Sequence, residues 1–435
     1  MVGESLLTCY SFIVTGNEAL NILMRGFTHT VKDPLWGNIP MTEEIKRILD
    51  TEEVVKLSGI RQNGPAYHIY PGAVHTRLSH SLGVYYLGRE MMLSAAMKAD
   101  GLPFTGRGLM SFLCACLLHD IGHFPYAHSL KELSVKEHEE IARELITVSP
   151  ELREAVSETG ADPEMTGLII DTDRDTDDEE TLFYRTVLSG TLDPDKLDYL
   201  SRDAFFAGIP YGRQDTSYII SSLSYADGHL VLDEDAISLV EQILFSKYMM
   251  YRNLYWHKGV RGATCMIKKA VLSALHDKVI NLADLYLKDD RGFAALCMSH
   301  MDYPPFRLVR DVEKGRLEER KAWKPYDENG TIEKKAKNIF TRSAAEDEIF
   351  SILHPAYPEL EKWQVIIDIP EPISFESGIF IRYHDGSIRK PDESEMLFSR
   401  TGRLYSSGLR KVALYLPDYI SSYDAGKAFK EVDLG

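Results

Sequence analysis

A succession of long stretches with helical periodicity, between residues 78 and 287, constrains the fold more than any other feature of this sequence. Apolar residues recur there at spacings of three and four, and Gly or Pro residues separate most of the stretches. We therefore predict helices over residues 78–99, 107–120, 136–148, 181–189, 194–207, 234–257 and 260–287. A further helix is expected over residues 42–56, with Thr42 as its N-cap.

The pattern changes beyond about residue 300. Short β-branched runs at 365–369, 379–383 and 412–416 are typical of strands, and a similar short strand is predicted over residues 67–70. The prediction is thus a mainly α fold, with a helical core and a smaller α+β C-terminal region. We place a lead-in of unassigned role at residues 1–28, the core at 29–290 and the C-terminal region at 291–435.

Composition restricts the class of protein. The chain of 435 residues has 49 Lys and Arg against 66 Asp and Glu, a net charge of −17, which argues against general binding to nucleic acid or an anionic membrane surface. Its five cysteines lack zinc-site spacing, so we expect buried thiols instead of disulfides or a thiolate metal site. No stretch reaches the length of an apolar membrane span, and the apolar run 6–14 lacks a preceding basic segment. We expect a soluble cytoplasmic protein.

A spaced set of His and acidic residues is the main candidate for chemistry. Its members are His80, His119, Asp120, His128, His138, Glu139, Asp193 and Asp195. Imidazole and carboxylate ligands together suit one divalent ion such as Mn, Fe, Ni, Co, Zn or Mg. Asp193 precedes Pro194 and is the natural N-cap of the next helix, so we favour Asp195 as the ligand.

A basic and aromatic window lies between Lys247 and Ala270, with six basic residues and no acidic one. Lys247, Tyr251 and Tyr255 are spaced to lie on one face of an α-helix. A cation beside stacking rings suits a nucleotide, whereas a solvated basic helix face would explain the window equally well.

Several segments together are similar to one known family. They are residues 31–37, 70–77, 80–84, 118–123 (Leu-His-Asp-Ile-Gly-His), 195–199, 202–203 and 255–258. They resemble the HD-domain metal phosphohydrolases, and more narrowly the deoxynucleoside-triphosphate triphosphohydrolases that include the vertebrate SAM-and-HD-domain enzyme. The resemblance covers residues 30–290 and implies an HD-domain helical core. It also implies release of inorganic triphosphate from deoxynucleoside triphosphates, and assembly into homo-oligomers, dimers or tetramers. A part for the C-terminal region in oligomerisation is a hypothesis that the resemblance does not itself supply.

The same resemblance assigns roles to individual residues. The implied metal ligands are His80, His119, Asp120 and Asp195. The implied catalytic groups are His128 as general acid, His138 and Glu139 in the proton path, and Arg77 on phosphate oxygens. The implied substrate contacts are Lys196 and Lys247 to phosphate, Tyr199, Asp203 and Gln62 to the sugar, and Tyr251 and Tyr255 in the basic and aromatic window. Tyr255 would exclude a 2′-hydroxyl.

Two departures from the family pattern affect these expectations. Val55 and Ser58 stand where relatives activated by guanine nucleotides carry Gln and Arg, so activation by GTP or dGTP is not expected. Lys247 and Tyr251 replace an Arg and a His, which extends the expected substrates to other nucleotides. Two alternatives stay open: an HD-type phosphohydrolase or phosphodiesterase acting on another nucleotide, and a nucleotide-binding regulatory protein with a vestigial site.

Overall fold

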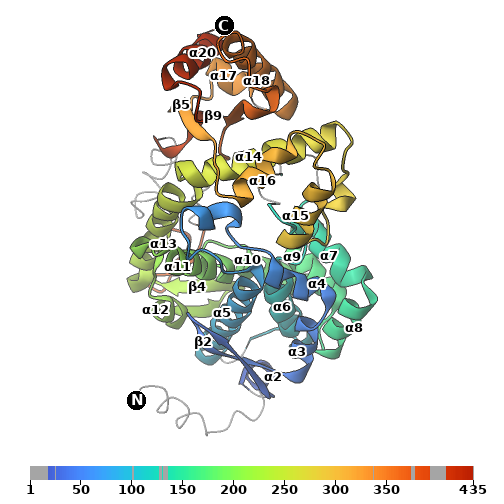
Figure 1. The fold of residues 1–435 in the computed structure, drawn as a ribbon. Coiled ribbons are helices and arrows are strands. Elements are labelled where there is room, and N and C mark those ends of the chain that lie inside the picture. Colours follow the sequence, from blue (N-terminus) through green and yellow to red (C-terminus); the bar gives the residue numbers. More distant parts are fainter. Residues whose placement is uncertain are drawn as a thin grey trace.

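The computed structural model describes residues 18–24, 26–99, 102–126, 130, 136–336, 338–373, 378–391 and 408–434. These residues form a mainly helical protein with three small sheets (Figure 1). The predicted fold class is therefore confirmed. Most of the predicted lead-in, including the apolar run 6–14, lies outside the described residues.

The helical core is built around α5 (Arg77–Lys98), which packs against α6 (Gly106–Leu118) and α11 (Pro194–Ala207). A capping box starts α5, because the Thr76 hydroxyl accepts from the Ser79 N–H while the Ser79 hydroxyl accepts from the Thr76 N–H. Helix α6 is buried along most of its length, as its continuous apolar sequence requires. These three helices carry the residues of the candidate site.

The other helices of the core and of the segment after it lie around this centre (Figure 1). Before α5 come α2 (Glu18–Met24), α3 (Glu43–Leu49) and α4 (Glu52–Val55). Between α6 and α11 come α7 (His138–Val148), α8 (Pro150–Glu158), α9 (Pro163–Ile170) and α10 (Glu179–Leu188). After α11 come α12 (Thr216–Ser221), α13 (Ile237–Met250), α14 (Lys258–His276), α15 (Asp290–Ser299) and α16 (Phe306–Glu313).

The C-terminal end of the molecule holds α17 (Thr331–Lys335), α18 (Ile339–Leu353) and α20 (Ser422–Leu434) beside a three-stranded sheet (Figure 1). That sheet has the order β5 (Glu319–Pro325), β9 (Lys411–Leu416), β6 (Ile366–Asp368), and both pairings are antiparallel. A separate hairpin, β1 (His29–Asp33) and β2 (Gly37–Met41), lies at the opposite end of the molecule.

The third sheet joins segments that are far apart in the sequence. Its order is β3 (Leu223–Ala226), β4 (His229–Asp233), β7 (Phe380–Arg382) and β8 (Ile388–Arg389). Strand β7 pairs in parallel with β4, so the strand predicted at 379–383 does not join those predicted at 365–369 and 412–416. Ile379 and Ile381 accordingly belong to the same apolar cluster as the helical core. The C-terminal region is thus tied to the core by backbone pairing.

Most predicted helices are confirmed, with shifted ends. The predicted helix 42–56 is divided into α3 and α4, although Thr42 does accept the Ile45 N–H as its N-cap. The predicted helix 260–287 stops at His276, because Lys278 takes a left-handed φ of 58°. The strand predicted at 67–70 is wrong: Gly64–His68 is a 3-10 turn, which Pro65 favours at its start.

Helix 234–257 also differs from its prediction. Its centre is α13, and the chain then continues through a π-helical turn, Tyr251–Tyr255, before α14 begins at Lys258. A π-turn places one extra residue in the helical spiral and so changes the direction of the side chains that follow. Tyr255 therefore does not share the simple α-helical face predicted for it with Lys247.

Two further predictions concern the cysteine side chains and membrane-spanning segments. Cys114, Cys116, Cys265 and Cys297 are free and buried, as predicted; Cys9 lies outside the described residues. Among the described helices, none combines the length and apolar character needed to cross a membrane.

Candidate metal centre and catalytic pocket

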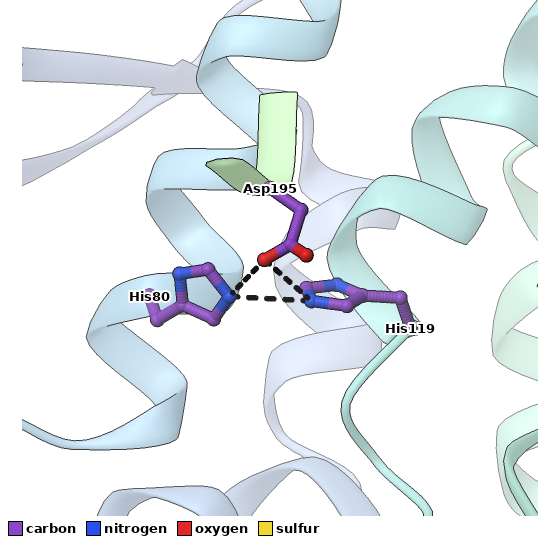
Figure 2. A group of neighbouring side chains, drawn as sticks. All are labelled: His80, His119 and Asp195. Atoms are coloured by element: carbon purple, nitrogen blue, oxygen red, sulfur yellow. Dashed lines mark hydrogen bonds and ion pairs between the residues drawn. The ribbon is translucent and has the colours of Figure 1, made fainter. Parts of the chain in front are cut away.

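Three predicted ligands come together where α5, α6 and α11 meet (Figure 2). The His80 Nε2 atom lies 3.0 Å from Asp195 Oδ1 and 3.3 Å from His119 Nε2. The Asp195 oxygen is 3.9 Å from the same nitrogen of His119. His80 lies in the first turn of α5, His119 caps the end of α6 and Asp195 lies in the first turn of α11.

The two imidazoles are oriented by their other nitrogen atoms. His80 Nδ1 lies 2.8 Å from Asp198 Oδ2, and His119 Nδ1 lies 3.0 Å from the Cys116 carbonyl oxygen. Both of these partners are acceptors, so each Nδ1 carries a hydrogen and each Nε2 is turned toward the centre of the cluster. This is the arrangement in which ligand histidines are held at metal centres.

The cluster needs positive charge at its centre. Two Nε2 atoms and the Asp195 carboxylate face one another, an arrangement that a proton or a metal cation between them stabilises. Burial lowers the pKa of His80, but its hydrogen bonds to Asp195 and Asp198 outweigh burial and raise the pKa to about 10. Burial raises the pKa of Asp195, but His80 and His119 bring it down to about 2. The donor set therefore fits a divalent ion.

The choice between the two neighbouring aspartates follows the prediction. Asp193 Oδ1 accepts the Lys196 N–H at 2.6 Å and so caps α11, with Pro194 at the first helical position. Only Asp195 reaches the two histidines. Because a capping side chain bends back toward its own helix, Asp193 is unable to point outward at the same time.

Asp120 lies beside this cluster without reaching its centre. Its Oδ2 accepts from Arg77 Nη1 at 2.7 Å, and its Oδ1 is 3.5 Å from His119 Nε2 and 3.2 Å from His123 Nε2. Burial raises the pKa of Asp120, but Arg77 and the two histidines hold it well below its ordinary value. Asp120 is thus a carboxylate next to three grouped ligands, and its part in a four-ligand set stays a prediction.

A second group of possible ligands comprises Asp120, His123 and His138. The His123 and His138 rings are stacked, with centroids 3.8 Å apart and planes inclined by 18°. A metal ion lies in the plane of each imidazole that binds it, so two parallel stacked rings are poorly placed for one ion.

The residues predicted for proton transfer are only partly described. His138 Nδ1 lies 2.9 Å from Glu139 Oε2, which suits a proton path. His128, the predicted general acid, lies outside the described residues.

A cavity of about 520 Å³ opens onto the group formed by His80, His119 and Asp195. It has the size typical of ligand pockets. The residues predicted from the sequence that line it are Gln62, Arg77, His80, His119, Asp120, His138, Glu139, Asp195, Tyr199, Asp203, Tyr251 and Tyr255.

Two predicted substrate contacts, both within the described part of the chain, are not part of this lining. Lys196 Nζ donates to the Gly190 carbonyl oxygen at 2.7 Å and pairs with the Asp193 carboxylate. Lys247 lies one turn before the end of α13, and the π-turn separates it from Tyr255. The rule of i, i+4, i+8 spacing assumes an uninterrupted α-helix, so it does not extend through the π-turn to Tyr255, and the phosphate contact of Lys247 stays a prediction.

The cavity also has lining residues that sequence reasoning missed. They are Asn63, His123, Trp256, Arg261, Thr264, Lys268, Ile369, Glu371 and Pro372. The basic window contained a signal for Arg261 and Lys268. Nothing in the sequence indicated that residues 369–372, more than 170 positions beyond Asp195, would form a wall of the same cavity.

A buried ionic network supports the cluster from behind. Arg202, fully buried, donates to both Asp198 oxygens at 2.8 and 2.9 Å and to Asp33 Oδ2 at 2.7 Å. Trp36 Nε1 also donates to Asp198 Oδ1. Because Asp198 holds His80 Nδ1, the network connects the β1–β2 hairpin to the orientation of a metal ligand.

Gly122 provides a test of how α7 is seated against the site. A Cβ atom added there would lie 1.9 Å from the His138 carbonyl oxygen and 2.8 Å from the Ala142 nitrogen, both of them backbone atoms. We expect Gly122→Ala to lower the free energy of unfolding by about 1–3 kcal/mol, measured from urea midpoints. Gly426→Ala, in α20 with nothing within 4 Å, is the control. Equal stability of the two variants would contradict the close seating of α7.

Comparisons with known proteins are consistent with this architecture. Residues 77–165 match the family model described as HD domain, and residues 214–401 match the model described as HD associated region. His80, His119 and Asp120 fall within the first match, and Asp195 lies between the two. The chain therefore contains an HD domain followed by an HD-associated region.

The chain is similar in sequence to individual proteins over much of its length. It is 28% identical over 395 residues to the uncharacterized protein MJ1154 of Methanocaldococcus jannaschii, covering 89% of this chain and 79% of that protein. It is 26% identical over 277 residues to the deoxynucleoside triphosphate triphosphohydrolase SAMHD1 of Bos taurus, covering 56% of this chain and 47% of that protein. The chain thus spans less than half the length of this second relative.

A solved structure shares the fold. The crystal structure of a phosphohydrolase, BT4208, from Bacteroides thetaiotaomicron matches with a TM-score of 0.70 at 22% identity, covering 89% of this chain and 99% of that one. The match extends over the core and much of the C-terminal region, so the arrangement of both recurs in another protein.

Proposed function

We propose that this protein is a metal-dependent HD-domain phosphohydrolase that converts deoxynucleoside triphosphates into deoxynucleosides and inorganic triphosphate. One observation carries the proposal: His80 Nε2, His119 Nε2 and Asp195 Oδ1 converge, with both rings pre-oriented, at a cavity of nucleotide size. A pure binding protein has no need of two oriented imidazoles facing a carboxylate. The similarity to SAMHD1 supports the choice of deoxynucleoside triphosphates.

Some residues of the cavity would act on the phosphates of the substrate and others would contact its sugar. A divalent ion held by His80, His119 and Asp195, with Asp120 beside it, would polarise a phosphate and lower the pKa of a bound water. Arg77 lines the same cavity and pairs with Asp120 at 2.7 Å. Its guanidinium would therefore lie close to a phosphate bound beside Asp120 and neutralise its oxygens.

Proton transfer and sugar contact fall to other side chains. His138, paired with Glu139 at 2.9 Å, is placed to exchange a proton with a group in the cavity. The rings of Tyr199, Tyr251 and Tyr255 form an aromatic wall, with Tyr251 and Tyr255 centroids 5.0 Å apart. Such a wall suits the apolar face of a deoxyribose or a base.

A product assay tests the proposal. Purified protein with Mn²⁺ or Mg²⁺ is given each dNTP alone, all four together, and ribonucleotide controls, and products are separated by ion exchange. We expect deoxynucleoside and triphosphate from single dNTPs without added GTP, since Val55 and Ser58 replace the guanine-reading residues. Chelation with EDTA should abolish release, and readdition of metal should restore it.

Other outcomes would favour other functions. Turnover only in the dNTP mixture would show that an activator is required. Release of monophosphates or cleavage of other phosphodiesters would favour an HD-type enzyme acting on another nucleotide. Tight nucleotide binding without any product would favour the regulatory alternative. Light scattering on the same preparation tests the proposed homo-oligomer.

A further inference from the structure

Tyr255, at the sugar wall of the cavity, is held by its hydroxyl group. The hydroxyl donates to Asp203 Oδ2 at 2.6 Å. Burial, together with the Asp203 carboxylate, raises the pKa of Tyr255 well above its ordinary value, so the hydroxyl keeps its proton. The ring packs against the apolar core and makes edge contacts with Tyr199 and Tyr251, and the directional hydrogen bond of the hydroxyl adds a restraint on its tilt.

Asp203 is held in turn by a histidine that does not belong to the cavity lining. His75 Nε2 lies 2.7 Å from Asp203 Oδ1, and the two side chains are only 1% and 2% exposed. A carboxylate only accepts, so His75 Nε2–H is the donor. The His75 ring stacks on Phe206, with centroids 4.7 Å apart, and its Nδ1 has no hydrogen-bond partner among the described residues. Among the residues that the structure describes, the hydrogen-bond partner of this buried ring is therefore Asp203.

The hydrogen bonds from His75 to Asp203 and from Tyr255 to Asp203 hold a part of the chain whose backbone is unusual. Tyr255 ends the π-turn Tyr251–Tyr255, and π-turns need support from their surroundings because their hydrogen bonding is less favourable than that of an α-helix. Tyr70 gives a second support by donating from its hydroxyl to the Asn253 carbonyl oxygen. Both supports come from the segment just before α5.

This segment also leads directly into the metal site. His75 precedes Arg77 and His80 by two and five residues, and a capping box at Thr76 fixes the start of α5. His75, which holds Asp203, and His80, a candidate metal ligand, thus lie on one short stretch of the chain. The spacing between the sugar wall and the metal is therefore set by that stretch.

We propose that His75 is a positioning residue for sugar selection: through Asp203 it holds the Tyr255 ring at the depth that admits a deoxyribose and excludes a ribose. The proposal rests on the proposed function, because it concerns how that substrate is distinguished. His75 itself touches neither substrate nor metal. Its loss should widen the sugar pocket and leave the metal ligands in place.

The test compares the ratio of kcat/KM for dATP and ATP across variants. We expect His75→Ala to lower this ratio by about tenfold, the size of effect that a single pocket contact has on selectivity. His75→Gln keeps an N–H donor near the position of Nε2 and should restore most of the ratio. Metal content measured by mass spectrometry should be unchanged in both.

Two further variants separate positioning from general damage. Tyr255→Phe keeps the ring and removes the hydroxyl, so it should reproduce the loss of selectivity, and His75→Ala should add nothing in that background. His354→Ala is the control, since His354 stacks on Phe350 at the same 4.7 Å but lies on the C-terminal region. If His75→Ala fails to fold, His75→Gln and Tyr255→Phe still carry the test.

The outcomes distinguish this inference from the proposed function. Wild-type turnover of dATP with an unchanged ratio in His75→Ala and Tyr255→Phe would overturn the inference alone. If no nucleotide is hydrolysed, the ratio of dissociation constants for dATP and ATP, followed by fluorescence of Trp256 in the cavity wall, replaces kcat/KM as the readout. Absence of both turnover and binding would overturn both proposals.

Discussion

Asp195→Asn is expected to abolish the proposed binding of a divalent metal and, with it, the proposed catalytic activity. The substitution keeps the shape of the side chain and removes the carboxylate charge that faces both His80 and His119, at 3.0 and 3.9 Å. Loss of a residue that merely orients a ligand lowers metal affinity by about 10–100-fold, so loss of a ligand itself should exceed about 100-fold. Calorimetric titration with Mn²⁺, and metal content after dialysis, measure the change.

The neighbouring aspartate provides a closely matched control. Asp193→Asn changes the same functional group two residues away, where the carboxylate caps α11 and pairs with Lys196. Asparagine is itself a good N-cap, so we expect a modest loss of stability and nearly normal metal affinity. Metal loss in Asp193→Asn with retention in Asp195→Asn would reverse the assignment of cap and ligand.

Arg202→Met should be among the most destabilising single substitutions in the helical core. It leaves the buried carboxylates of Asp198 and Asp33 without their shared cation, and breaking a buried ion pair in this way costs about 3–5 kcal/mol. That is a large part of the about 5–15 kcal/mol that holds a typical protein folded. Denaturant midpoints followed by circular dichroism measure the loss.

A surface pair of the same length shows what burial contributes. Arg47 donates to Glu158 at 2.7 Å, but the two side chains are 51% and 41% exposed, so Arg47→Met should cost far less stability than Arg202→Met. Arg202→Met should also weaken metal binding, because Asp198 would no longer be held in place for His80 Nδ1. Similar stability of the two variants, or unchanged metal affinity in Arg202→Met, would contradict the proposed support of His80.

Much of the local structure was predictable because it depends on neighbouring residues. The periodicity of α5 and α6 indicated helices close to those observed, and the Asp193-Pro194 pair indicated the start of α11. The distinction between Asp193 and Asp195 followed from helix-capping geometry alone. Side-chain types and order also indicated that His80, His119 and Asp195 would meet.

Predictions failed where local patterns were compatible with more than one structure. Residues 67–70 alternate like a strand, but Gly64 and Pro65 start a 3-10 turn just before them. Helical spacing placed Lys247 and Tyr255 on one face, yet the chain changes to a π-turn between them. A π-turn depends on contacts such as the one from Tyr70 to the Asn253 carbonyl, which spacing along the sequence does not express.

The sequence by itself determined the helical class, the caps that begin the main helices, and the kinds of ligand available for a metal. Only the tertiary structure decided that Asp198 and Cys116 orient the imidazoles, that β7 pairs with β4, and that residues 369–372 wall the cavity. The reason is physical. Capping and periodicity act within a few residues, whereas these contacts depend on how distant segments bury apolar surface and satisfy one another's polar groups.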